Sequence, residues 1–405
     1  MSSAIERVTG LSWKDQGLAL LVSFGHAGTH WIIMTFYLIL PFVRTDLGLT
    51  YTEAAFLVSV VHISSTSANF GSGLVVDVTG RKVIFLIISL IIGGCAFTIF
   101  SFGPGYPVMV ALVVLIGASS NLWHPAAIAY LSHRYPAKKG YALSLHVTGA
   151  SVADSLAPLL AGSLISWIAW QGAVLFGALP AFIGAGLIAL ILLRGDTKAV
   201  TGRQTMGFRQ YLEGIRQLVT KRAVIALCVM SGFRNMTING LYLFLPLYLA
   251  DVLEFSPLLM GATMTALQLG AVIGTPIAGV ASDRMSRRAI MIVVLTISTT
   301  ALVAMIFVES NVLFVTAVAA VGFLLFSIRP VIQSWMMDLT PPGVGASAMS
   351  LLFGTQSAFS ATAPIIGGII ADNWGLHPVF FMLAGTILIA NLLVFALPRR
   401  DARRV

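Results

Sequence analysis

Ionisable side chains lie deep inside several long apolar stretches of this sequence, where such groups are rare. They include His26, His30, Asp154, Arg234 and Arg329. A charge at the centre of a bilayer costs from about 2.5 kcal/mol on insertion scales to more than about 10 kcal/mol in simulations, so each of these residues is a candidate for function. An imidazole or a carboxyl group can take up and release a proton, whereas a guanidinium stays charged and offers a planar fork of donors to an anion.

The proton-binding candidates all fall in the first half of the chain. His26 and His30 are four residues apart and therefore share one face of a helix, and Asp154 is the only acid this deep in an apolar stretch. His124 precedes Pro125, which should kink its helix and leave a backbone carbonyl free. We predict a proton-coupling group of four residues, namely Asp154, His26, His30 and His124.

Two permanent cations, Arg234 and Arg329, lie in the second half of the chain. Their donor forks suit a carboxylate, a sulfonate or a phosphonate. One deep acid cannot neutralise two arginines, although an ion pair of one arginine with Asp154 or Asp338 is an open alternative. Gln333 stands one helical turn after Arg329. The predicted substrate-binding residues are Arg234, Arg329, His30, Asn235, Asn239, Gln333 and Trp123.

The histidines also allow a second interpretation, a bound metal ion. His26-x-x-x-His30 together with a third histidine could hold a transition metal. Two uncompensated arginines nearby would repel a cation, so we predict no metal and no other cofactor. His62 and His146 lie nearer the ends of their apolar stretches, and we interpret them as packed, hydrogen-bonded histidines.

Twelve apolar stretches carry these residues, and each is long enough for the roughly 20-residue helix that crosses a bilayer. Hydrophobic residues make up 58% of the 405 residues and charged residues only 10%, against roughly 25% in soluble domains. This composition excludes a water-soluble enzyme and a disordered protein. Only helices satisfy their own backbone in lipid, so we predict an all-α integral membrane protein with twelve transmembrane helices. The stretches are 17–43, 52–76, 83–102, 108–131, 141–167, 172–193, 223–250, 257–282, 289–308, 312–337, 345–370 and 378–397.

The basic residues predict the orientation of the chain in the membrane. With the N-terminus in the cytoplasm, 21 of the 24 Lys and Arg fall in cytoplasmic segments, and the external loops hold only Arg44. Cytoplasmic loops carry such an excess of positive charge, so we predict that both termini are cytoplasmic. The net charge of +9 therefore reports topology, and no nucleic-acid partner is expected.

The chain divides at a polar segment and repeats itself across it. Residues 194–222 hold seven Lys or Arg and two acids, with apolar residues at helical spacing, which predicts a basic amphipathic helix on the membrane surface. At an offset of about 205 residues, His124-Pro125 matches Arg329-Pro330 and Gly73–Lys82 matches Gly279–Arg288. We predict two pseudo-symmetric six-helix bundles, 1–193 and 223–405, joined by this linker. Repeats of this kind bind substrate between the halves.

The sequence Gly73-x-x-x-Asp77-x-x-Gly80-Arg81-Lys82 resembles the signature loop of the major facilitator superfamily, and the weaker copy at Gly279–Arg288 stands where that family has its second one. The resemblance covers the whole chain and implies two bundles that rock about a central site. It also implies that the two loops form a cytoplasmic latch, whereas topology alone would account only for their basic residues. The predicted gate residues are Gly73, Asp77, Gly80, Arg81, Gly279, Asp283, Arg284 and Arg287.

Two further tracts, Ser23-Phe24-Gly25-His26 and Trp123-His124-Pro125-Ala126-Ala127, resemble the fosmidomycin-resistance-type exporters. With the intramembrane charges, this resemblance predicts proton-coupled export of a small organic anion or anionic drug. Two alternatives stay open: a proton-coupled symporter that imports an organic acid, and a His-based metal-cation transporter. We expect a monomer in the bacterial inner membrane, with the anion, protons and lipid as partners. An enzyme is not expected, since the chain shows no nucleophile–base pair and no nucleotide loop.

Overall fold

The structure is a computed structural model that describes residues 13–193, 213, 216–340 and 344–398. These residues form helices joined by short connections, with no strand among them. Nine of the described helices are long and apolar enough to cross a membrane, judged by length and composition. Large apolar side chains such as Leu190 (63% exposed) and Phe176 (54%) stand on their outer surfaces. Exposed apolar surface of this extent is typical of a protein that contacts lipid.

The described residues of the first half form five helices. They are α2 (Trp13–Leu47), α3 (Tyr51–Thr79), α4 (Lys82–Phe100), α5 (Tyr106–Arg134) and α6 (Lys139–Leu192). Helix α6 contains two of the predicted spans, because its backbone leaves helical geometry at Ile168 and Ala169. Ala169 has φ of 59°, a left-handed conformation that interrupts the helix where the sequence predicts a turn.

The second half forms seven helices among the described residues. They are α8 (Arg222–Asp251), α9 (Pro257–Arg284), α10 (Arg287–Met305), α11 (Asn311–Ser327), α12 (Arg329–Leu339), α13 (Gly345–Trp374) and α14 (Leu376–Val394). One predicted span is divided between α11 and α12, since Pro330 lacks an N–H and cannot continue the helix from the preceding turn. With α6 counted as two spans and α11–α12 as one, the described helices correspond to the twelve predicted stretches.

The chain separates into two compact units. One comprises Met1–Ile39 and Ile63–Arg203, and the other comprises Leu40–His62 and Gln204–Val405. The end of α2 and the start of α3 therefore belong to the second unit. The boundaries 1–193, 194–222 and 223–405 stay a prediction, and most of the predicted surface helix at 194–222 lies outside the described residues.

Hydrogen bonds and an ion pair fasten the α2–α3 turn within the second unit. The Arg44 guanidinium lies 2.9 Å from the Asp251 carboxylate at the end of α8, and the Tyr51 hydroxyl donates to the same carboxylate at 2.9 Å. The backbone N–H groups of Tyr51 and Thr52 donate to the Asp372 carboxylate of α13 at 2.8 and 3.0 Å. A carboxylate is favourable there because the first N–H groups of a helix have no partner within it.

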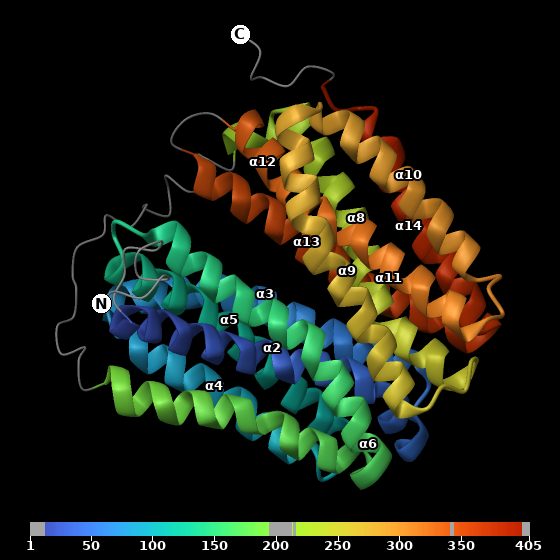
Figure 1. Cartoon of the computed structure of the whole chain (residues 1–405), viewed down its shortest axis with the longest axis horizontal. Helices are drawn as coiled ribbons and strands as arrows, with labels where there is room; N and C mark the ends of the chain where they lie inside the picture. Colours follow the sequence, from blue (N-terminus) through green and yellow to red (C-terminus); the bar gives the residue numbers. More distant parts are fainter. Residues whose placement is uncertain (1–12, 194–212, 214–215, 341–343, 399–405) are drawn as a thin grey trace. The chain divides into compact units, whose positions relative to one another are not determined.

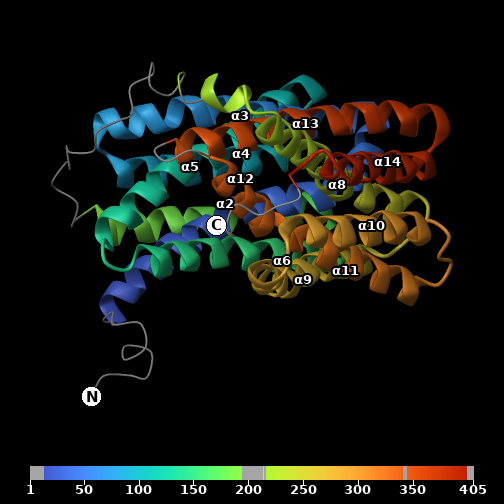
Figure 2. The same ribbon diagram turned by 90° about the horizontal axis from the view of Figure 1, so that it is seen from above.

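Close helix contacts hold each unit together. In the first unit, α4 packs along α5 and α6, and in the second unit α8 packs against α13 and α14 while α9 packs against α11 (Figure 1 and Figure 2). A methyl group at Gly322 of α11 would overlap the Leu267 carbonyl oxygen of α9, and one at Gly149 of α6 would overlap the Ser23 carbonyl oxygen of α2. Glycine is required at such positions because the backbones themselves touch.

Candidate functional site

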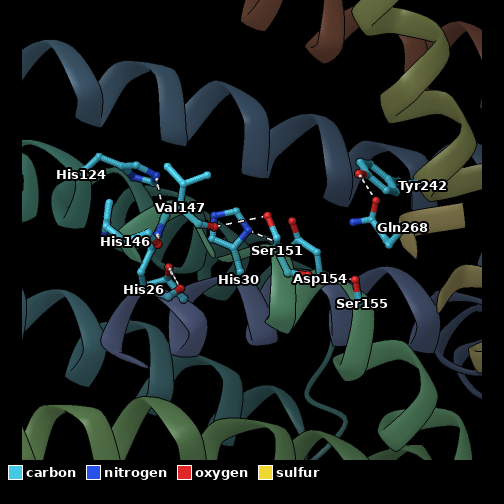
Figure 3. A network of polar contacts seen from close by, with 11 residues as sticks. His26, His30, His124, His146, Val147, Ser151, Asp154, Ser155, Tyr242 and Gln268 are labelled. Carbon is cyan, nitrogen blue, oxygen red and sulfur yellow. Dashed lines mark hydrogen bonds and ion pairs between the residues drawn. The ribbon is translucent and has the colours of Figure 1, made fainter. Parts of the chain in front are cut away.

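Four histidines and one acid meet inside the first unit, and their side chains point toward one another (Figure 3). Helix α2 supplies His26 and His30, α5 supplies His124, and the first part of α6 supplies His146 and Asp154. The ring centroids of His26 lie 4.7 Å from His30 and 5.0 Å from His124. The structure thus brings together all four residues that the sequence predicts for proton coupling.

Backbone carbonyls determine which nitrogen carries the proton in two of these rings. His26 Nδ1 lies 2.7 Å from the carbonyl oxygen of His146, and His124 Nδ1 lies 2.9 Å from that of Ser120. A carbonyl oxygen only accepts hydrogen bonds, so each Nδ1 carries a proton and donates it. Each Nε2 then presents a lone pair, and the two Nε2 atoms face each other at 3.3 Å. Two facing lone pairs repel, so this arrangement favours a proton or a cation between the rings.

Asp154 is paired with His30 within the first unit. Its Oδ1 lies 2.8 Å from His30 Nδ1, and the two side chains are 20% and 28% exposed. Arg234 and Arg329 belong to the second unit, and the alternative of an ion pair between Asp154 and one of them stays a prediction. A proton can be bound by either the carboxylate or the imidazole of such a pair.

His146 belongs to this group, although the sequence predicts only a packed, hydrogen-bonded histidine there. Its ring stacks on that of His26 with 3.8 Å between centroids and 15° between planes. It is 3% exposed, and neither ring nitrogen has a hydrogen-bond partner among the described residues. His146 and Asp154 are eight residues apart, which places both on one face of α6. This spacing is the sequence feature from which the proximity of His146 to the site could have been predicted.

Trp123, predicted as a substrate contact, is fully buried at 0% exposure. Its indole ring fills the space beside Gly25, where a methyl group would overlap it. The ring also lies parallel to that of His26, with 6.4 Å between centroids. Trp123 therefore packs against the histidine cluster, and its role in substrate binding stays a prediction.

Arg234 in the second unit is buried at 2% exposure and is bound to the backbone. Its Nε donates to the Leu325 carbonyl oxygen at 3.0 Å, and a terminal nitrogen donates to the same oxygen. Leu325 lies in the last turn of α11, where carbonyl groups have no partner within the helix. Arg234 thus caps the helix break that Pro330 creates, a structural role that sequence reasoning did not foresee.

Arg329 at the start of α12 is exposed and has no acid partner among the described residues. Asp338, the other acid that the sequence offered as its partner, instead forms an ion pair with Arg287 at 2.7 Å. Of the two arginines, only Arg329 is open to a ligand.

The two asparagines predicted as substrate contacts join α8 to α13. Asn235 and Asn239 both donate to the Ser360 hydroxyl oxygen, at 3.2 and 2.8 Å. Tyr242 and Gln268 form a further buried pair at 3.1 Å between α8 and α9 (Figure 3). Gln333 is half-buried on α12. The asparagine amides are therefore engaged in helix packing, and a role in binding substrate stays a prediction.

The two signature loops differ in their backbone. Gly80 has φ of 66°, a left-handed conformation that favours glycine. Ser286 stands at the equivalent point of the second loop with φ of −65°, and its side chain accepts from the Ala289 N–H at the start of α10. This difference explains why the second copy lacks the glycine.

The remaining gate residues are described only in part. Arg81 is exposed at the start of α4. Arg287 is 4% exposed, and its bond to Asp338 lies within the second unit. The side-chain surroundings of five gate residues lie outside the described ones, so the latch stays a prediction. They are Gly73, Asp77, Gly279, Asp283 and Arg284.

The apolar helices and the charged groups inside them define a multi-pass membrane protein of the transporter class. The chain belongs to the Major Facilitator Superfamily, whose family model matches residues 20–268 and again residues 231–405. This confirms the superfamily and the fold expected from the signature loop. Members of this family are transporters and not enzymes.

Three similar proteins illustrate the relationship. The multidrug resistance protein MdtG of Klebsiella pneumoniae is 25% identical over 409 residues, covering 94% of this chain and 92% of that protein. A probable hexose phosphate transport protein of Chlamydia trachomatis is 23% identical over 402 residues, covering 89% and 85%. A bacterial homologue of the human lysosomal transporter Spinster, solved in an inward-facing and unoccupied conformation, superimposes with a TM-score of 0.78 at 15% identity, covering 95% and 97%.

Proposed function

We propose that this transporter exports a small organic anion or anionic drug in exchange for protons. The observation that carries the proposal is Arg329, an exposed guanidinium inside a predicted span with no acid partner among the described residues. A permanent charge that faced lipid would be costly, so such a group is expected along the path of a ligand. An arginine selects anions of carboxylate, sulfonate or phosphonate type.

The histidine group of the first unit supports the proton part of the proposal. His30 with Asp154, and His26 with His124, form two adjacent contacts that each accommodate a proton. Titratable groups inside membrane spans commonly form proton relays in transporters. The permanent cations lie in the second unit, so proton and anion would be bound by different halves of the chain.

The relatives support export and an anionic cargo to different degrees. MdtG of Klebsiella pneumoniae is named for multidrug resistance, and the Chlamydia trachomatis relative is named for hexose phosphate, an anion. Both are 25% identical or less, so neither name transfers to this chain by itself. Together with Arg329 they favour an anionic cargo over a neutral one.

A current measurement separates export from its main alternative. Exchange of one inward proton for one outward monoanion moves two charges, about 4.6 kcal/mol per 100 mV, whereas symport of a proton with a monoanion moves none. A thermal-shift screen of carboxylates, sulfonates and phosphonates would first identify a ligand. In proteoliposomes we expect its transport to carry current and to respond to membrane potential. Electroneutral, proton-coupled uptake would contradict the proposal and favour the symporter.

A further inference from the structure

We propose that His26, His30 and His124 form a binding site for a divalent transition-metal ion of the zinc class. One ligand nitrogen from each of these rings lies within 4.8 Å of the other two. Three imidazoles with an open fourth position are a recurrent zinc site. The proposal goes beyond the proposed function, because it concerns binding alone and does not depend on which ion drives transport.

The spacing of two ligands already fits a metal. His26 Nε2 and His124 Nε2 are 3.3 Å apart. Two zinc–nitrogen bonds of about 2.0–2.1 Å at the tetrahedral angle separate their nitrogens by about 3.4 Å. The carbonyl partners of both Nδ1 atoms leave both Nε2 atoms as lone pairs, which is the state that a metal ion requires. Binding would then need only the third ring, His30, to move inward.

The outer hydrogen bonds of all three rings match those of metal-bound histidines. A ligating imidazole almost always donates its other N–H to a carboxylate or a backbone carbonyl. Here His26 donates to the His146 carbonyl oxygen, His124 to the Ser120 carbonyl oxygen, and His30 Nδ1 contacts the Asp154 carboxylate at 2.8 Å. These partners fix the ring orientations, and the carboxylate offsets part of the charge of a cation.

His146 provides an independent sign of a ligand. It is 3% exposed and stacked on His26, yet both of its ring nitrogens have no partner among the described residues. Buried polar atoms nearly always have a partner. A water bound to the open position of the metal would supply one.

Charge and ligand type limit the choice of ion. The three ligand histidines all belong to the first unit, whereas Arg234 and Arg329 belong to the second. Imidazole nitrogens suit Zn²⁺, Co²⁺, Ni²⁺ and Cu²⁺, whereas Mg²⁺ and Ca²⁺ prefer oxygen ligands. We therefore expect that the site does not bind Mg²⁺ or Ca²⁺.

Cobalt titration of the purified full chain tests the proposal. The protein is stripped with chelator after removal of any oligohistidine tag, and Co²⁺ is added while the visible absorption is recorded. We expect one equivalent to bind with the intense d–d bands of tetrahedral Co²⁺, and Zn²⁺ to displace it. The variants His26→Gln and His124→Gln should lose these bands. His62→Gln changes a histidine of α3 that is not one of the three clustered ligands; it serves as the matched control and should keep these bands.

Asp154→Asn gives a graded readout, since loss of an outer carboxylate typically weakens metal affinity about 10- to 100-fold. Gel filtration and thermal melting establish that each variant is folded, and His30→Gln at a partly exposed position replaces any variant that is not. Absence of binding to the folded wild-type chain, or unchanged bands in the cluster variants, would overturn the proposal. Neither result involves transport, so the proposed export of anions is judged separately by the current measurement.

Discussion

Asp154 and His30 form the only described contact in which an intramembrane acid meets a titratable base. If this pair carries the coupled proton, Asp154→Asn should abolish accumulation driven by a pH gradient while leaving anion exchange at equal pH intact. One pH unit is worth about 1.4 kcal/mol, so one-proton exchange drives about tenfold accumulation in the wild type.

Flux assays with and without a pH gradient measure this prediction in proteoliposomes. Ser151→Ala serves as a control, because its hydroxyl bonds only to the preceding turn of the same helix at Val147. Normal pH-driven accumulation by the folded Asp154→Asn variant would contradict the assignment.

Substitution of Arg329 should affect ligand binding, whereas substitution of Arg234 should affect folding stability. A hydrogen bond to a charged group contributes about 1.5–3 kcal/mol, so Arg329→Ala should weaken anion affinity by roughly 10- to 150-fold. Thermal-shift titration with the anion found in the screen measures this change. An anion that stabilises the wild type and Arg329→Ala alike would remove Arg329 from the site.

Arg234→Ala should instead lower stability in the absence of any ligand. It would leave the buried Leu325 carbonyl oxygen without the donors that Arg234 supplies. A buried polar group left unsatisfied costs about 1–3 kcal/mol. Thermal unfolding without ligand should therefore show a lower midpoint for Arg234→Ala than for Arg329→Ala. Equal midpoints for the two variants would contradict the capping role.

At the scale of helices, contact between backbones determines which substitutions each helix tolerates. Gly322→Ala should destabilise the second unit by about 1–3 kcal/mol, the usual cost of overpacking, because its methyl group would overlap the Leu267 carbonyl oxygen of α9. Gly354→Ala on α13 is the matched control, since nothing lies within 4 Å of its Cβ position. The control should be neutral or slightly stabilising, as alanine favours helix by about 1 kcal/mol over glycine. Similar midpoints of thermal unfolding for both variants would show that α9 and α11 are not held this closely.

For the whole molecule, the basic residues predict the orientation of every span. A fluorescent-protein fusion after residue 405 should fluoresce, since that reporter folds in the cytoplasm, and a phosphatase fusion near residue 48 should be active, since that enzyme needs the exterior. The physical reason is the placement of 21 of 24 Lys and Arg on one side of the predicted spans. The opposite reporter pattern would reverse the orientation and, with it, the proposed direction of transport.

The sequence alone determined the spans, the repeat and the superfamily, because these properties are read along one dimension. An apolar stretch of sufficient length has only one way to satisfy its backbone in lipid, and the signature loop is a local motif. The sequence also identified the charged residues inside the spans as functional candidates. The free-energy cost of a charge in hydrocarbon follows from the residue type and its position in the span, both of which are read from the sequence.

Only the tertiary structure decided which of these residues meet. Whether Asp154 faces His30, and whether Arg234 meets a ligand or the carbonyl of Leu325, depends on how far each helix is rotated about its own axis and shifted along it. A rotation by one residue turns a side chain by about 100°, and the pattern of apolar residues in a helix buried on all sides does not define that angle. The stacking of His146 on His26 and the ion pair of Asp338 with Arg287 were hidden from the sequence for the same reason.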